Sequence, residues 1–166
     1  MNFNDVDFSK LKIVNNNILY EDKRGLNIIT PKMRVPFGLD EEYGKYLLKL
    51  EFSDLYNNDE ITNFYEFIKK LEEFFKNHYN NSGIYKSLIR LNRSYDPVFC
   101  AKVMERYNRL ECSVVNKKDK SLTTIYDIQK NSNVTALLSF DRVWEMSKQN
   151  KLRNGYIVYV RKICCV

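Results

Sequence analysis

Hydrophobic side chains recur every three or four residues in one long segment in the middle of the chain. The repeat comprises Ile61, Phe64, Tyr65, Ile68, Leu71, Phe75 and His78. This spacing predicts an amphipathic helix over residues 59–79, with Asn58 or Asp59 as its N-terminal cap. We expect Glu72 and Glu73 to lie on the solvated side of this helix.

Most of the other hydrophobic positions fall in short runs that are bounded by turn-forming residues, a pattern typical of strands. These runs cover residues 12–14, 18–20, 26–30, 45–52, 85–91, 99–107, 110–115, 134–147 and 156–163. Hairpin tips are predicted at residues 23–25, at residues 116–120 and at Asn154-Gly155, and a short helical turn at residues 125–131.

Many short strands with one substantial helix between them predict a mainly β fold. The best match is an OB-like small β-barrel with one long inserted helix, forming a single domain over residues 1–166. A closed barrel also removes the exposed edges that so many strands would otherwise present. A sandwich with a helix on one side stays open as an alternative.

Charge is distributed unevenly along the chain, whose net charge is +6. Residues 1–82 hold 11 Lys or Arg and 14 Asp or Glu, a net charge of −3. Residues 83–166 hold 16 Lys or Arg and 7 Asp or Glu, a net charge of +9. A strongly basic half favours a surface that faces a polyanion, because positive potential attracts phosphate before contact. Solvated charges without a partner are the alternative.

Sequence features of enzymes and metal proteins are weak. There is no glycine-rich phosphate loop and no nucleophile elbow. The four cysteines and the single His78 do not have the spacing of a zinc site. We expect no catalytic residues, no cofactor and no metal, and no apolar run is long enough for a membrane span. The run Asp40-Glu41-Glu42 is interpreted as a solvated loop or a first helical turn, with a metal-dependent nuclease as the alternative.

Cations and aromatic rings interleave over residues 85–109, a combination suited to single-stranded nucleic acid. In a strand over 99–107, Lys102 and Arg106 would share one face, whereas Phe99 and Tyr107 would share the core-facing side. Phe140, Arg142, Trp144 and Met146 would share a face of a later strand, and Tyr159 and Arg161 repeat the pattern. The candidate phosphate contacts are Arg90, Arg93, Lys102, Arg106, Arg109 and Arg142, and the candidate stacking rings are Tyr95, Tyr107 and Trp144.

A second candidate site is the segment over residues 30–39, which contains two prolines. Proline stiffens the backbone and blocks regular strand pairing. Lys32 and Arg34 supply cations and Phe37 supplies an apolar ring, so the segment could form a rigid loop over a bound strand. Alternatively, it is a structural connection in which Phe37 fills the core.

Four features in this order resemble a known family. They are the segment Thr30-Pro31-Lys32-Met33-Arg34-Val35-Pro36-Phe37-Gly38, the sequence Ser94-Tyr95-Asp96-Pro97, the strand through Lys102 and the late strand with Trp144. Together with the long helix, they resemble the single-stranded DNA-binding proteins of nucleocytoplasmic large DNA viruses. The resemblance implies an OB-type fold, sequence-tolerant binding of single-stranded DNA in viral replication, and a location in the host cytoplasm.

Two further possibilities remain open at this point. RNA is an alternative polymer, and self-association is possible. A non-enzymatic interaction module, such as a virion or replication-complex subunit, would use the same basic surface to dock on an acidic protein.

Overall fold

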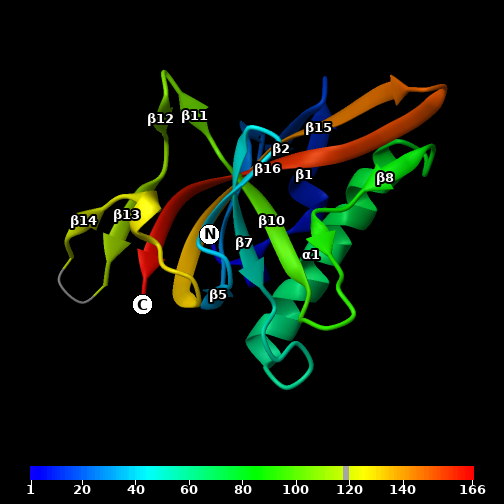
Figure 1. The fold of residues 1–166 in the computed structure, drawn as a ribbon. Helices are drawn as coiled ribbons and strands as arrows, with labels where there is room; N and C mark the ends of the chain where they lie inside the picture. Colours follow the sequence, from blue (N-terminus) through cyan, green and yellow to red (C-terminus); the bar gives the residue numbers. More distant parts are fainter. Residues whose placement is uncertain (118–119) are drawn as a thin grey trace.

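The computed structural model describes residues 1–117 and 120–166 and is mainly β, with one long helix (Figure 1). The first strands are β1 (Leu11–Val14), β2 (Asn17–Tyr20), β3 (Lys23–Arg24), β4 (Leu26–Ile29), β5 (Met33–Val35), β6 (Leu39–Glu42) and β7 (Lys45–Glu51). After the helix α1 (Asp59–His78) come β8 (Ile84–Lys86), β9 (Ile89–Arg90), β10 (Val98–Val103), β11 (Glu105–Arg106), β12 (Arg109–Leu110), β13 (Ser113–Asn116) and β14 (Leu122–Thr123). The 3-10 turn η3 (Ile125–Asp127) precedes β15 (Ser132–Lys148) and β16 (Lys151–Cys165). The loop predicted at 116–120 includes residues 118–119, which lie outside the described residues.

Five of the strands pair in a closed circuit. β15 pairs with β5, β5 with β7, β7 with β10, β10 with β16, and β16 with β15. Every pair is antiparallel except β10–β16, which is parallel. In chain order the strands of this circuit are β5, β7, β10, β15 and β16. The helix α1 joins the second of them, β7, to the third, β10. In Figure 1 it lies on the side opposite the projecting β11–β12 and β13–β14 hairpins.

The alternation predicted for β10 is confirmed for its core-facing side and for Lys102, whereas Cys100, which would share the face of Lys102, is buried. Phe99, Ala101 and Val103 are buried, whereas Lys102 lies half-buried on the outer face. The same prediction for Tyr107 is wrong, since its side chain is 97% exposed. β10 ends at Val103, and Tyr107 lies in the turn of the β11–β12 hairpin with a φ of 50°.

The helix is confirmed, ending one residue earlier than predicted. The side chain of Asn58 caps it by accepting hydrogen bonds from the backbone N–H groups of Glu60 and Ile61. Its apolar side packs onto β16, where the rings of Phe75 and Tyr156 lie 5.0 Å apart between centroids. His78, the last member of the apolar repeat, is exposed.

The prediction that Glu72 is solvated is wrong, because its side chain is buried between α1 and the strands. Its Oε1 atom accepts hydrogen bonds from Ser87 Oγ at 2.8 Å, from the Leu88 backbone N–H at 3.1 Å and from the Tyr156 hydroxyl at 2.7 Å. These donors need an acceptor when they are withdrawn from water. A carboxylate on the inner side of the helix satisfies all three.

The segment over residues 30–39 contains the circuit strand β5 at Met33–Val35, so the expectation that its prolines prevent strand pairing is wrong. Pro31 and Pro36 flank β5 and do not interrupt it. Met33 and Val35 point into the core, with exposures of 1% and 0%. Phe37 is 48% exposed and therefore does not fill the core.

The Asn154-Gly155 pair does not form a turn but lies inside β16. The chain reverses instead at Gln149 and Asn150, which have φ values of 54° and 58° and join β15 to β16. Gly155 is the cross-strand partner of Trp144, and a Cβ atom at Gly155 would lie only 2.9 Å from the indole ring. The glycine therefore makes room for Trp144.

A β-bulge in β15 changes which side chains share a face. The pairing register with β16 shifts between Phe140 and Arg142, which leaves Asp141 as the additional residue. Phe140 is fully buried, whereas Arg142 is exposed and Trp144 half-buried. The prediction that all three share one face is therefore wrong. The bulge directs the arginine and the tryptophan to the outside.

Candidate nucleic-acid interface

A hollow of about 530 Å³ lies beside the only tryptophan of the chain. We call it the Trp144 hollow. It is lined by Lys45, Lys86, Ser87, Leu88, Arg90, Lys102, Trp144, Glu145, Met146, Tyr156 and Ile157. These residues come from β7, β8, β9, the connection between β8 and β9, β10 and the β15–β16 pair, so the hollow forms only in the folded protein. It combines four cationic side chains with two aromatic rings, of Trp144 and Tyr156, and the ring of Tyr156 is buried.

A second hollow, of about 480 Å³, is more strongly cationic, and we call it the four-arginine hollow. It is lined by Arg24, Asn27, Met104, Arg106, Ser139, Asp141, Arg142, Tyr159 and Arg161. Asp141 is the one acidic residue among them. It accepts hydrogen bonds from Arg161 at 2.9 Å and from the Ser139 hydroxyl at 2.6 Å.

A smaller hollow of about 300 Å³ connects the other two. It shares Lys45 and Lys102 with the Trp144 hollow, and Met104 and Tyr159 with the four-arginine hollow. Lys102 and Tyr159 are register partners in the parallel β10–β16 pair, so this pair forms the floor. The three hollows together form one depression, which we call the groove.

Most cations of the groove carry an uncompensated charge. Within the described parts of the chain, Lys45, Lys86, Lys102, Arg24 and Arg142 form no ion pair. Burial, followed by the charge of Lys45, lowers the pKa of Lys102. Bringing like charges together is costly, and a bound anion would relieve that cost.

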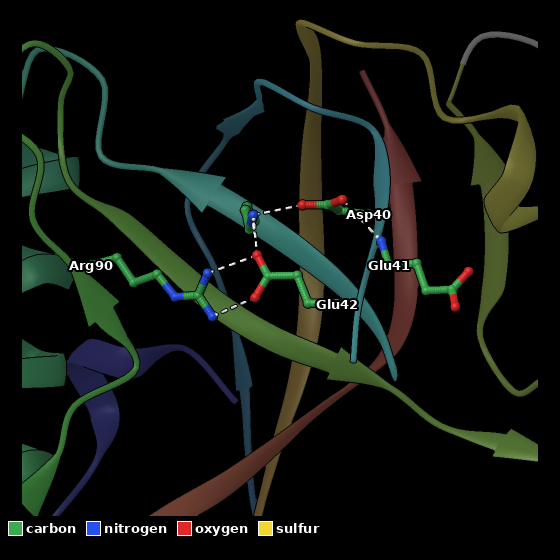
Figure 2. A network of polar contacts seen from close by, with 5 residues as sticks. Asp40, Glu41, Glu42 and Arg90 are labelled. Carbon is green, nitrogen blue, oxygen red and sulfur yellow. Dashed lines mark hydrogen bonds and ion pairs between the residues drawn. The ribbon is translucent and has the colours of Figure 1, made fainter. Parts of the chain in front are cut away.

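Arg90 differs from the other cations of the groove, because it belongs to a compact acid–base network (Figure 2). Its two terminal nitrogens donate to the two carboxylate oxygens of Glu42, both at 2.8 Å. Lys49 Nζ lies 2.6 Å from Glu42 and 2.5 Å from Asp40. We call these four side chains the Glu42 network.

The acidic run over residues 40–42 is strand β6, so its interpretation as a loop or a first helical turn is wrong. β6 pairs antiparallel with β7, and Glu41 points away from Arg90 (Figure 2). Asp40 and Glu42 face Lys49 and Arg90, which occupy the carboxylate oxygens that a divalent cation would need. Within the described residues, no three His, Cys, Asp or Glu side chains form a group suited to a metal ion.

The Glu42 network makes the stability of the protein dependent on acid pH. The hydrogen bonds from Arg90 and then Lys49 lower the pKa of Glu42 to about 2. Because the unfolded chain binds this proton more readily, the stabilisation is present above about pH 5 and is lost as the pH falls towards about 2. We expect a loss of roughly 1–3 kcal/mol, after allowance for solvent screening.

The measurement is urea unfolding at a series of pH values, with Glu42→Gln and Glu73→Gln compared with the unchanged chain. Glu42→Gln removes this part of the pH dependence, whereas Glu73→Gln on the exposed side of α1 leaves it in place. Identical acid profiles for the two variants would contradict the prediction.

The structure brings five of the sequence-predicted site residues to the groove. They are Arg90, Lys102, Arg106, Arg142 and Trp144. The other candidates lie elsewhere: Lys32, Arg93 and Tyr95 are exposed beside strand ends, and Tyr107 and Arg109 lie on the β11–β12 hairpin. Arg34 forms an ion pair with Glu51 on β7 at 2.6 Å, and the ring of Phe37 packs under Lys49 Nζ at 5.2 Å.

Four cations of the groove are absent from the phosphate contacts predicted from the sequence, namely Arg24, Lys45, Lys86 and Arg161. Lys45 and Arg24 lie in the half of the chain with a net negative charge, so the charge argument directed attention away from them. Arg24 was also assigned to a hairpin tip, whereas Glu21 and Asp22 form that turn and Arg24 belongs to β3. Lys86 lies on the short strand β8, which pairs with β16 beside Gly155. The alternation of side chains along β8 alone would not have identified Lys86 as a groove residue.

Two solved structures are similar to the chain over most of its length. The single-stranded DNA-binding protein from bacteriophage Enc34, solved as a C-terminal truncation, gives a TM-score of 0.51 at 16% identity and covers 95% of both chains. The T7 protein gp2.5, described as a single-stranded DNA binding protein, gives a TM-score of 0.50 at 10% identity over 86% of both chains. The chain shares the fold of these phage proteins. No family model and no curated protein matches its sequence.

The similarity to these two structures shows the fold alone, because both sequence identities are low. Neither of the two proteins comes from a nucleocytoplasmic large DNA virus. Within residues 1–117 and 120–166, none of the helices has the length and apolar character to cross a bilayer.

Proposed function

We propose that the protein binds single-stranded DNA in the groove, without preference for sequence and without catalysis. The observation that carries this proposal is the continuity of the three hollows, which join unpaired cations to Trp144 and Tyr159. Single-strand binding needs cations that follow the backbone and flat rings on which bases stack. Stacking tolerates any base, since every base has a π-face.

The architecture supports the same proposal. We interpret the closed circuit of β5, β7, β10, β16 and β15 as an OB-like barrel, and the whole chain as one domain of this type. In OB folds the outer face of the second and third strands, together with neighbouring loops, holds oligonucleotides. Here these strands are β7 and β10, and β10 supplies Lys102 to the groove.

The roles of the side chains follow from their chemistry. The arginines of the four-arginine hollow would hold phosphates, since guanidinium groups match phosphate oxygens geometrically. Lys45, Lys86 and Lys102 would neutralise the phosphates that flank a base stacked on Trp144. If about four to six phosphates are neutralised, log K falls with log salt with a slope of about −3 to −4.

The biological setting is also part of the proposal. Both structural neighbours are phage proteins that bind single-stranded DNA. A viral origin, a role in DNA replication and a location in the host cytoplasm agree with that likeness. A relation to the proteins of nucleocytoplasmic large DNA viruses is the narrower form of this proposal.

The experiment that tests this function uses Trp144 as its reporter, because the chain holds no other tryptophan. Titration with oligo-dT should quench the indole fluorescence if a base stacks on the ring, and added salt should reverse the quenching. Oligo-U and duplex DNA, titrated in parallel, measure the preference for polymer and strand number. Unchanged fluorescence together with no binding in a gel-shift assay, or equal affinity for duplex, would contradict the proposal.

A further inference from the structure

The outer face of the β7–β10 pair carries two lysines in very different surroundings. Lys102 on β10 opens into the groove. Lys49 on β7 lies opposite Cys100, two positions further along the same pair. Its side chain is only 12% exposed and contacts Asp40 and Glu42 of β6 and the ring of Phe37. One end of this face is therefore open, whereas the other end is closed by the protein itself.

At the closed end, two carboxylates bind the cations in the way that phosphates of a nucleic acid would bind them. Glu42 takes both terminal nitrogens of Arg90, and Lys49 Nζ lies between Glu42 and Asp40. Two cations thus face two acids, and the network has no net charge. The other cations of the groove lack such partners among the described residues, except that Arg161 pairs with Asp141 and Arg106 lies 3.5 Å from Glu111.

We infer that Asp40 and Glu42 set the boundary of the nucleic-acid site: they occupy the two cations that would otherwise extend it over β7, and so direct a bound strand across β10, β16 and β15. This inference rests on the proposed function and adds where the site ends and what ends it. A strand that advanced towards Lys49 would have to displace two carboxylates and then lie beside them. Repulsion between carboxylate and phosphate opposes both steps.

The path of the strand follows from this boundary. From the Trp144 hollow, a continuation with cations that form no ion pair among the described residues runs past Lys102 and Tyr159 to the four-arginine hollow. In an OB fold the face of the second and third strands takes part in oligonucleotide binding. In this chain the part of β7 around Lys49 is unavailable, whereas Lys45 at the start of β7 lines the groove.

The test compares the unchanged protein with the double variant Asp40→Asn, Glu42→Gln. Both replacements keep a carbonyl oxygen that can accept from Lys49 and Arg90, so the local fold has the means to persist. For oligo-dT of about 30 nucleotides, we expect roughly tenfold tighter binding and a salt slope steeper by about 1.4, from two further phosphates at about 0.7 each. Stoichiometric titration should also give a larger number of nucleotides per protein.

The matched control is Glu66→Gln, Glu73→Gln on the exposed side of α1, which changes the net charge by the same amount. It raises affinity only through the general field, so its salt slope and site size stay at the original values. Equal slopes and site sizes for the two double variants would overturn the inference. So would weaker binding by the Asp40→Asn, Glu42→Gln variant with an unchanged unfolding transition.

A second pair of variants leaves both carboxylates in place and tests the same boundary. Lys49→Met and Lys102→Met remove one lysine each from the same face. We expect Lys102→Met to flatten the salt slope by about 0.7 and Lys49→Met to leave it unchanged. A flattening by Lys49→Met equal to that of Lys102→Met would place nucleic acid over β7 and refute the boundary. If neither the unchanged protein nor any of the variants binds oligo-dT, the proposed function itself is refuted.

Discussion

The double variant Arg106→Glu, Arg142→Glu is expected to bind oligo-dT at least about 100-fold more weakly at about 0.1 M salt. Both side chains are exposed and line the four-arginine hollow, so their replacement has little effect on the core. Each change removes an attraction for phosphate and introduces a repulsion. Because two phosphate contacts are lost, the slope of log K against log salt should become less steep by about 1.4.

The measurement is quenching of Trp144 fluorescence at several salt concentrations, supported by gel shift. The control is Lys69→Glu, Lys70→Glu on α1, which makes the same change of net charge on exposed positions of the helix. If the control weakens binding as much as the arginine variant does, the total charge of the protein determines affinity and the groove does not.

The replacement Glu72→Leu is expected to destabilise the protein by about 2 kcal/mol, because one buried and two partly buried donors lose their acceptor. The donors are Ser87 Oγ, the Leu88 backbone N–H and the Tyr156 hydroxyl. Ser87, Leu88 and Tyr156 also line the Trp144 hollow. The loss should therefore loosen one wall of the groove as well as the contact between α1 and β16.

Urea unfolding measures this effect, with Glu73→Leu as the comparison. Glu73 is adjacent in the chain but exposed, so its replacement should change stability by less than about 0.5 kcal/mol. Glu72→Gln should fall between the two leucine variants, since its amide oxygen still accepts hydrogen bonds. Equal unfolding midpoints for Glu72→Leu and Glu73→Leu would show that the buried network contributes nothing.

The features that were predictable from the sequence depend on neighbouring residues. The helix α1 follows from the spacing of its apolar side chains and from Asn58 as its cap. The outward direction of Lys102 follows from the alternation of β10. Both patterns are complete within a few residues, and no distant contact reverses them.

The features that could not be predicted depend on partners far away in the chain. The burial of Glu72 requires donors from residues 87, 88 and 156, which only the folded chain brings to it. The Asn154-Gly155 pair has the composition of a turn, but the space required by Trp144 on the paired strand explains its glycine. The bulge at Asp141 reverses the alternation of side chains along β15, and no local sequence pattern predicts this bulge.

The site was therefore only partly predictable. Arg142 and Trp144 were identified by residue type, although the face assigned to them was wrong. Arg24 and Lys45 reach the groove from an acidic half of the chain. Strand pairing places β7 beside β10, and it places β3 beside β2, which in turn pairs with β15. Charge summed along a sequence cannot show which cations converge.

The parallel pairing of β10 with β16 has a consequence for the order in which the protein becomes functional. Lys102 and Tyr159, which meet in that pair, are separated by more than fifty residues. Until β16 has left the ribosome and paired with β10, a nascent chain therefore lacks the floor on which nucleic acid would lie. Residues 1–150 alone should not form the groove, however well their own strands pair.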